Sequence, residues 1–378
     1  MFTNHRALVL FATIVVALGG CGGASGTPSP TSSGATIQSP APTVRAISSP
    51  TPGPTVIPSA AALPPGYILL EHFGNAPDGT KLADTEARHL WLVKADGSDL
   101  HELAPGQPAT QPLRDKGPAD WSPDGNHIAF MTGNNGVFIY ETDVAGTAPR
   151  LISTDCAKTP NDCLEFFPAY SPDGKRLAFI RLTDKPPTPP SGVVAIRDLS
   201  NGKVTLLEST RQGPPNQELG APVWSPDGTR LVYFQLPKDA DGAPTGSSEL
   251  MIVGADDTGR HALTTPGVAA GDPGWSPDGS LIVFSNEPIH NWNDAGLADH
   301  PDIYVIHPDG TGLKRLTSDE GSGAPSWMPD GRILYFSQRG LWLMGADGSN
   351  PTRVGLGGMS LVSATTGYSY YARWQPTP

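Results

Sequence analysis

The sequence predicts an all-β fold, a closed β-propeller of six four-stranded blades, from three observations. A five-residue phrase, Trp-Ser-Pro-Asp-Gly, occurs in five copies, spaced by about 50 residues as expected for propeller blades. Short apolar segments of strand length follow every copy. A sixth, partial repeat is divided between the residues before the first copy and the C-terminus. The copies begin at Trp121, Tyr170, Trp224, Trp275 and Trp327, with Tyr replacing Trp in the second and Met replacing Ser in the fifth.

Each copy predicts a tight turn that joins the first strand of a blade to the second. Pro presets φ, Asp accepts a hydrogen bond from the backbone ahead of it, and Gly tolerates a positive φ. Because this role accounts for the recurring carboxylates, we assign them to structure and not to catalysis, which needs a pocket and a tuned pKa. These turn residues are Asp124, Asp173, Asp227, Asp278 and Asp330. The tryptophans of the phrases are assigned to the core between blades.

Two apolar strands follow each turn. Continuous runs rich in β-branched and aromatic residues are typical of strands that are buried on both faces. The predicted second strands are Ile128–Phe130, Leu177–Ile180, Leu231–Phe234, Leu281–Phe284 and Ile333–Phe336. The predicted third strands are Val137–Tyr140, Val193–Ile196, Leu250–Val253, Ile303–Ile306 and Leu341–Met344.

A more polar fourth strand completes each blade. Hairpin dipeptides such as Asp309-Gly310 and Asp347-Gly348 precede it and favour a two-residue turn. Rising polarity is expected for the outer strand of a blade. The predicted fourth strands are Leu151–Ser153, Val204–Leu207, His261–Thr264, Lys314–Thr317 and Thr352–Val354.

The blade before the first copy lacks its inner strand. Tyr67–Leu70, Leu90–Val93 and Leu100–Leu103 correspond to second, third and fourth strands. Trp374, near the C-terminus, falls about one repeat period after the last copy of the phrase. We therefore expect Tyr371–Trp374 to supply the missing strand and close the ring, which leaves no sheet edge exposed there.

The repeat resembles the WD40-like propeller repeat of the TolB family. The resemblance rests on the repeated phrase together with Ile303–Gly310 and Lys314–Thr317, and it covers roughly residues 67–378. The same repeat occurs in the propellers of prolyl-oligopeptidase-like proteases. The resemblance implies an envelope propeller that binds protein partners. The small α/β domain that precedes the TolB propeller has no counterpart here, so TolB's particular partners and transport role are not implied.

The N-terminal residues predict an exported lipoprotein. His5 and Arg6 precede an apolar stretch and then small residues, the layout of a signal peptide. The stretch is short for a membrane span. Leu18-Gly19-Gly20-Cys21 resembles a bacterial lipobox, which would make Cys21 the acylated first residue of the mature protein. The alternative is an ordinary signal peptide with an incidental cysteine.

These features divide the chain into three parts. Residues 1–20 are the expected lipoprotein signal peptide, 21–65 a lipid-anchored linker, and 66–378 the propeller. The linker is rich in Pro, Ser, Thr and Gly, has no aromatic residue and carries one charge, Arg45. Such a segment cannot bury enough apolar surface to fold, so it is expected to be a disordered tether.

The two remaining cysteines, Cys156 and Cys163, enclose six residues. In an exported protein this spacing favours a local disulfide, which would contribute roughly 2–3 kcal/mol. A thiol-bound metal would require more soft ligands than this loop provides. We therefore expect a disulfide.

The charge balance excludes one class of partner. The net charge is −12, and the propeller has no cluster of Lys and Arg. This argues against nucleic acid and against direct docking on anionic lipid. The expected attachment to the bacterial membrane is the N-terminal lipid, with the propeller facing the periplasm or the cell exterior.

Strand parity separates the propeller into two faces. Both kinds of short turn lie on one face, here called the turn face. Loops from second to third strands and connections between blades lie on the opposite, long-loop face, where binding sites are expected. The long segments there are 72–88, 183–192, 237–248 and 285–301.

The richest of these loops contains His290, Asp294 and His300, which have the ligand types of a zinc, manganese or calcium site. Its spacing matches no metal motif, so the alternative is a solvated insertion with Trp292 packed on the next blade. Trp292 and Asp299 are candidates for a binding face. Asp302 opens a strand, and a structural role is expected for it.

The sequence thus favours a non-catalytic binding module for a protein, peptide or glycan of the cell envelope, without a cofactor. The alternative is a propeller enzyme, a metal-assisted lyase or hydrolase with its site on the long-loop face. No Gly-x-Ser-x-Gly or His-Glu-x-x-His motif occurs, and the hydrolase domain that accompanies this repeat in the peptidases has no counterpart in the sequence.

Overall fold

The structure is a computed structural model. It describes residues 66–73, 75–82, 87–104, 116–133, 136–147, 149–158, 163–183, 191–211, 217–237, 246–265, 268–286, 301–319, 321–337, 340–356, 359 and 369–376. The expected signal peptide and linker, residues 1–65, lie outside this part of the chain, so the division into three segments stays a prediction.

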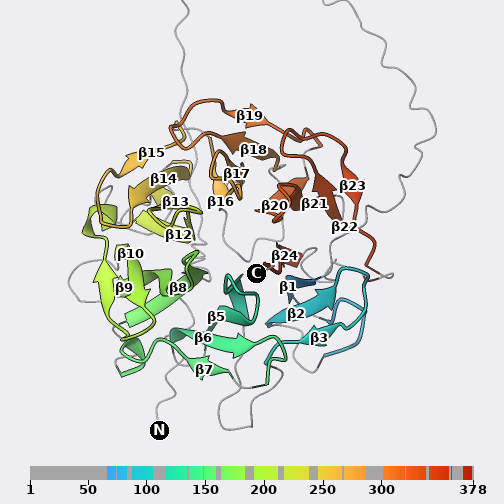
Figure 1. The fold of residues 1–378 in the computed structure, drawn as a ribbon, viewed down its shortest axis with the longest axis horizontal. Helices are drawn as coiled ribbons and strands as arrows, with labels where there is room; N and C mark the ends of the chain where they lie inside the picture. The colour runs from blue at the N-terminus through green and yellow to red at the C-terminus, as the bar shows by residue number, and fades with distance from the viewer. Residues whose placement is uncertain are drawn as a thin grey trace, which may run out of the picture. The chain divides into compact units, whose positions relative to one another are not determined.

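The described residues form six antiparallel sheets of four strands each, which confirms the six-bladed prediction. Figure 1 shows the sheets arranged as blades around a central axis. From the axis outward, the strands of blade 1 are β24, β1, β2 and β3. Each of blades 2 to 6 has four consecutive strands, which begin at the axis with β4, β8, β12, β16 and β20.

The strands of blades 1 to 3 are β1 (Tyr67–Phe73), β2 (Arg88–Lys94), β3 (His101–Glu102), β4 (Lys116–Trp121), β5 (His127–Gly133), β6 (Val137–Asp143), β7 (Arg150–Leu151), β8 (Cys163–Tyr170), β9 (Arg176–Thr183), β10 (Ser191–Asp198) and β11 (Val204–Leu206). Those of blades 4 to 6 are β12 (Gln217–Trp224), β13 (Arg230–Pro237), β14 (Glu249–Gly254), β15 (His261–Ala262), β16 (Gly271–Trp275), β17 (Ile282–Ser285), β18 (Ile303–Ile306), β19 (Lys314–Arg315), β20 (Ser322–Trp327), β21 (Ile333–Ser337), β22 (Gly340–Met344) and β23 (Thr352–Arg353). The closing strand is β24 (Ser369–Trp374), and two short 3₁₀ turns are η1 (Cys156–Lys158) and η2 (Glu208–Arg211).

The outer strands are shorter than the sequence predicts, two or three residues each. In blades 2 to 5 the reason is a hydroxyl side chain that follows the outer strand. Thr210 and Thr264 each accept, through Oγ1, the N–H of a residue in the third strand, Val194 at 3.0 Å and Leu250 at 3.0 Å. Ser153 and Thr317 do the same in blades 2 and 5. A side chain thus replaces the next backbone partner, and the ladder ends.

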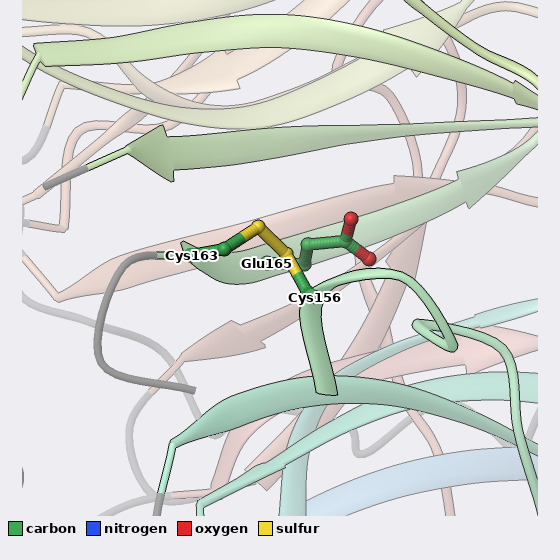
Figure 2. A group of neighbouring side chains, drawn as sticks. All are labelled: Cys156, Cys163 and Glu165. Atoms are coloured by element: carbon green, nitrogen blue, oxygen red, sulfur yellow. A yellow bond between two sulfur atoms is a disulfide. The ribbon is translucent and has the colours of Figure 1, made fainter. Parts of the chain in front are cut away.

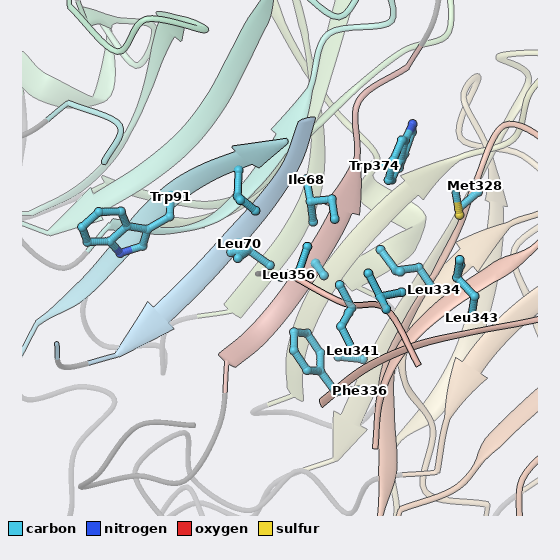
Figure 3. Close-up of a cluster of buried hydrophobic side chains, with 14 of the residues drawn as sticks. Ile68, Leu70, Trp91, Met328, Leu334, Phe336, Leu341, Leu343, Leu356 and Trp374 are labelled. Atoms are coloured by element: carbon cyan, nitrogen blue, oxygen red, sulfur yellow. The ribbon is translucent and has the colours of Figure 1, made fainter. Parts of the chain in front are cut away.

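The C-terminal strand closes the ring, as predicted. β24 pairs antiparallel with β1, with Ile68 opposite Trp374 and Leu70 opposite Ala372. The side chains of Trp374 and Ala372 are buried in a cluster shared with blade 6, which includes Leu334. Figure 3 shows this cluster between β1, β24 and the blade 6 strands. Apolar burial therefore holds the first and last blades together, while the β1–β24 ladder holds the C-terminal strand in blade 1.

The repeated phrase forms the predicted tight turns. In blade 4, Asp227 Oδ1 accepts the Ser225 hydroxyl at 2.5 Å and the Thr229 N–H at 3.0 Å. Gly228 has a φ of +67°, the left-handed region that glycine reaches without strain. In the fifth copy Met328 is buried in the core, and Asp330 pairs instead with Arg332 at 2.7 Å. The four Ser-containing copies share the blade 4 pattern.

Candidate functional site

A cavity of about 190 Å³ lies on the axis of the ring, between the innermost strands. Its walls come from five of the six blades and from the residues after β24. They consist of indole rings and small residues with a few polar groups. The lining residues are Asp120, Trp121, Ala221, Val223, Asp272, Pro273, Gly274, Trp275, Ala324, Pro325, Ser326, Trp327, Ala372, Arg373, Trp374 and Pro376.

β-Bulges in the inner strands shape this cavity. The pairing register shifts once in each inner strand of blades 2 to 6, at a proline that lies two or three residues before the phrase. Proline has no N–H for the ladder, so a bulge is where an inner strand tolerates it. In blades 4 to 6 the preceding residue has φ of +47° to +50°. These residues are Ala221, Asp272 and Ala324. The strands bend there, and the bulge residues line the cavity.

These prolines were not among the predicted features, although they recur before every copy of the phrase. Four of them stand two residues before the aromatic residue of their copy, namely Pro168, Pro222, Pro273 and Pro325, and Pro118 stands three residues before Trp121. Each repeat therefore has a motif of seven or eight residues that runs from this proline to the Gly of the turn. The turn joins the first two strands of the blade, and in blades 4 to 6 the residue before the proline lines the cavity.

The charged groups at the axis are Asp120, Asp272 and Arg373. Arg373 Nη1 lies 3.4 Å from Asp120 Oδ1, and Asp120 Oδ2 accepts the Tyr170 N–H at 2.9 Å. One carboxylate thereby connects three consecutive blades. Burial raises the pKa of Asp120, while Arg373 and the Tyr170 N–H oppose the rise. Both oxygens of Asp120 are engaged, which indicates that this residue braces the ring.

The phrase tryptophans also join neighbouring blades. Trp224 donates its indole N–H to the Ala169 carbonyl of the preceding blade at 3.2 Å. Trp275 and Trp327 donate to Val223 and Gly274 in the same way. Among the described residues Trp374 Nε1 has no hydrogen-bond partner. This hydrogen-bond pattern is thus interrupted at the blade that closes the ring.

The second copy departs from the pattern, and the structure explains why Tyr170 replaces Trp there. Its hydroxyl donates to the Glu141 carboxylate, which also accepts from Arg150 at 2.7 Å. Burial and this carboxylate raise the pKa of the Tyr170 hydroxyl far above its usual value, so the phenol remains a donor. The Asp120 carboxylate supplies the link to the preceding blade that an indole makes elsewhere.

Residues after β24 border the cavity on the turn face. Gln375 N donates to the Tyr67 carbonyl at 2.9 Å, and Gln375 Nε2 donates to the Gly125 carbonyl at 2.8 Å. Gly125 has a φ of +69°, and a Cβ there would lie 2.6 Å from the Pro376 carbonyl oxygen. Gln375 therefore fastens the end of the closing strand to the turn of blade 2.

The expected disulfide is present. Cys156 and Cys163 are bonded, with their Cα atoms 5.2 Å apart, within the usual range. Glu165 lies beside them (Figure 2), and two cysteines with a carboxylate include metal-ligand types. However, the Glu165 oxygens already accept from Ser153, Arg181 and Arg197. This arrangement indicates a structural cluster and not a metal site.

Of the remaining candidate residues from the sequence, the structure describes Asp302 but not those of the loop before it. His290, Trp292, Asp294, Asp299 and His300 lie outside the described residues, as does Cys21, so their roles stay predictions. Asp302 is described and buried, and its carboxylate pairs with Arg315 and accepts the Thr317 hydroxyl at 2.9 Å. These contacts give Asp302 a structural role at the start of β18.

The turn aspartates are ionised at neutral pH. Hydrogen bonds from the Ser225 hydroxyl and the Thr229 N–H lower the pKa of Asp227 to about 2, and those from Ser276 and Ser280 lower the pKa of Asp278 to about 2. A lowered pKa suits an acceptor held in a turn. It does not suit a general acid or base near neutral pH.

No helix in the described part of the chain is long and apolar enough to cross a membrane. No protein-family model matches the sequence. Individual relatives do match, and they decide the family.

The uncharacterized protein Atu1656 of Agrobacterium fabrum is 30% identical over 272 residues, which cover 68% of this chain and 80% of that protein. A TolB homolog of Chlorobium luteolum is 31% identical over 116 residues, covering 30% of this chain and 22% of its own length. TolB from Acinetobacter baumannii has the same propeller fold, with a TM-score of 0.55 over 82% of this chain and 67% of that chain at 18% identity. The chain belongs to the TolB-like β-propeller family.

The TolB-like propeller also matches a protein named as a peptidase. The uncharacterized peptidase YuxL of Bacillus subtilis is 26% identical over 225 residues, covering 49% of this chain and 31% of its own length. The chain thus spans less than a third of the length of the TolB homolog and of YuxL. A likeness of fold does not by itself carry over an activity.

Proposed function

We propose that this TolB-like propeller is an exported, lipid-anchored and non-catalytic module that binds a protein or peptide partner in the cell envelope. The observation that carries the proposal is the axial cavity, a concave site that the propeller builds from several blades at once. Family membership supports the envelope setting, and the lipobox-like segment ending in Cys21 supports the anchor.

The size of the cavity favours one or two side chains of a partner over a whole small substrate. Its volume of about 190 Å³ is below the ~300–1,000 Å³ of typical small-molecule pockets. Indole walls and a few polar groups are the features that bind an inserted anchor residue.

The lining also presents polar groups beside the indole rings. Asp120, Asp272 and Arg373 line the cavity, and Arg373 pairs with Asp120 at 3.4 Å. We expect hydrogen bonds from such groups to orient an inserted side chain, while the indole rings supply the apolar contact.

In-cell crosslinking followed by affinity capture tests the binding function. The wild-type protein is expected to retain a discrete partner. Val223→Trp places a bulky ring in the cavity and is expected to reduce the recovery of this partner at least ten-fold. Equal recovery with the variant would contradict a role for the cavity. Leu313→Trp, at a residue 47% exposed near the start of β19, is the matched control.

The lipid anchor is tested by Cys21→Ala. Without the thiol, no acyl chain can be attached, and the protein is expected to move from the membrane fraction to the soluble or secreted fraction. Detergent-phase partitioning measures the change, with Cys156→Ser/Cys163→Ser as the control that retains Cys21. Continued partitioning of Cys21→Ala into detergent would exclude this anchor.

A further inference from the structure

A cluster of four charged groups lies where blade 3 meets the connection from blade 2. Arg181 and Arg197 each pair with two carboxylates, Asp155 and Glu165. Asp155 Oδ2 lies 2.7 Å from Arg181 Nη2, and Asp155 Oδ1 lies 2.8 Å from Arg197 Nη2. Glu165 Oε1 lies 2.8 Å from Arg197 Nη2 and also pairs with Arg181. The two positive and two negative charges balance.

The balance matters because three of the four groups are largely removed from water. The side chains of Glu165, Arg197 and Arg181 are 0%, 3% and 12% exposed, whereas Asp155 is 46% exposed. Buried charges are tolerated when they are paired and become costly when a partner is removed. Without Asp155, the two guanidinium groups would share a single carboxylate.

Asp155 is firmly bound to the arginines. Burial acts to raise its pKa, but hydrogen bonds and attraction from Arg197 and Arg181 outweigh burial and hold the pKa at about 2. The carboxylate is therefore ionised throughout the physiological pH range.

The disulfide joins the two segments that carry these carboxylates. Asp155 immediately precedes Cys156, and Glu165 stands two residues after Cys163. Described backbone hydrogen bonds of residues 154–158 are local, such as Ala157 N to the Ser153 carbonyl at 3.0 Å and Lys158 N to the Asp155 carbonyl at 3.2 Å. The covalent link therefore adds to the Ser153–Glu165 hydrogen bond in holding this segment against β8.

We propose that the disulfide Cys156–Cys163 is a redox-controlled latch that holds Asp155 between Arg181 and Arg197. When a dithiol reduces it, the S–S bond accepts two electrons, two protons pass to the cysteine sulfurs, and the dithiol becomes a disulfide. Asp155 then loses its covalent tether to β8 and is held by the two arginine pairs alone. When it leaves them, the arginine pair presents a position that a carboxylate from solvent can occupy. This inference does not depend on the proposed binding function.

A two-by-two comparison of thermal unfolding tests the latch. The wild type and Asp155→Ala are each measured with the disulfide intact and after reduction with dithiothreitol. Reduction is expected to lower the Tm of the wild type at least about twice as much as that of Asp155→Ala, because interacting residues give non-additive effects. Equal shifts in both proteins would show that the disulfide acts only by restricting the unfolded chain, and would overturn the latch.

Chemical rescue is the second arm of the test. Added acetate is expected to raise the Tm of oxidised Asp155→Ala above its value in chloride of equal ionic strength. The control Asp256→Ala removes an exposed turn carboxylate that accepts from Thr258, and acetate is expected to have no such effect there. Equal Tm values in acetate and chloride for Asp155→Ala would contradict the carboxylate position. If Asp155→Ala does not fold, Asp155→Asn is used in both arms.

Discussion

Removal of residues 369–378 is expected to abolish cooperative unfolding. This segment holds β24, the inner strand of blade 1, which is contributed from the far end of the chain. Its Ala372 carbonyl accepts the Ser326 hydroxyl of blade 6 at 2.7 Å, and its Arg373 pairs with Asp120 of blade 2. The deletion therefore breaks the contacts of blade 1 with both neighbours and leaves β1 as an open edge.

The size of this effect follows from burial. Trp374 is 5% exposed within the cluster that joins blades 6 and 1. Truncating one buried tryptophan costs about 3–5 kcal/mol, while a whole domain has a net stability of about 5–15 kcal/mol. The deletion also removes the rest of the strand and its hydrogen bonds, so its total cost in free energy is expected to exceed the net stability of the domain. Differential scanning calorimetry measures the transition, with deletion of residues 377–378 as the control. A cooperative transition near the wild-type temperature would contradict the closure account.

Glu165→Gln is expected to destabilise the protein by about 3–5 kcal/mol, the cost of removing one partner from a buried ion pair. Glu165 is fully buried and accepts from Ser153, Arg181 and Arg197. A neutral amide nearly preserves the shape of the side chain, but it leaves Asp155 as the one carboxylate of the cluster facing two guanidinium charges. The effect is thus electrostatic and not a result of a packing defect.

Urea denaturation measures the change in the free energy of unfolding. The matched control is Glu208→Gln in η2, where Glu208 pairs with Arg211 at 2.8 Å but is 60% exposed. Exposed ion pairs contribute about 0–1 kcal/mol, so this control is expected to change stability little. A loss below about 1 kcal/mol for Glu165→Gln would show that the arginines find other partners.

The architecture could be predicted from the sequence because it depends on local, repeated signals. The turn at Asp227 needs only Ser225, Gly228 and the residues directly after them, and five copies define the period. The position of Trp374, one period after the last copy, was sufficient to predict the closing strand. The disulfide between Cys156 and Cys163 could also be predicted, from the spacing of the two cysteines and the expected export of the chain.

The axial site could not be predicted, because it depends on residues that are distant in sequence. Arg373 meets Asp120 only after the ring has closed, and Asp272 lines the same cavity from blade 5. The prolines before each phrase were visible in the sequence, but proline usually argues against a central strand. The bulge that resolves this conflict becomes apparent only in three dimensions. The polar roles of Glu165 and Arg197 depend in the same way on burial.

The expected site on the long-loop face stays a prediction, because His290 to His300 lie outside the described residues. Metal analysis of the soluble domain, with His290→Ala and His300→Ala, addresses that loop separately. The cavity lies toward the turn end of the inner strands, since the phrase tryptophans and Pro376 line it. The two surfaces are thus distinguishable by experiment.

Site-specific photocrosslinking in living cells tests the central claim, that this propeller binds a partner through its axial cavity. A photoreactive amino acid is placed at Val223 in the cavity, at Thr265 on the long-loop face and at Leu313 on the outer rim. Cavity binding predicts a discrete adduct from the photoreactive residue at Val223 and none from that at Leu313. If the residue at Thr265 also forms an adduct with this partner, that adduct is expected to disappear when Val223→Trp is introduced. Adducts confined to Leu313, or none from Val223, would contradict binding in the cavity.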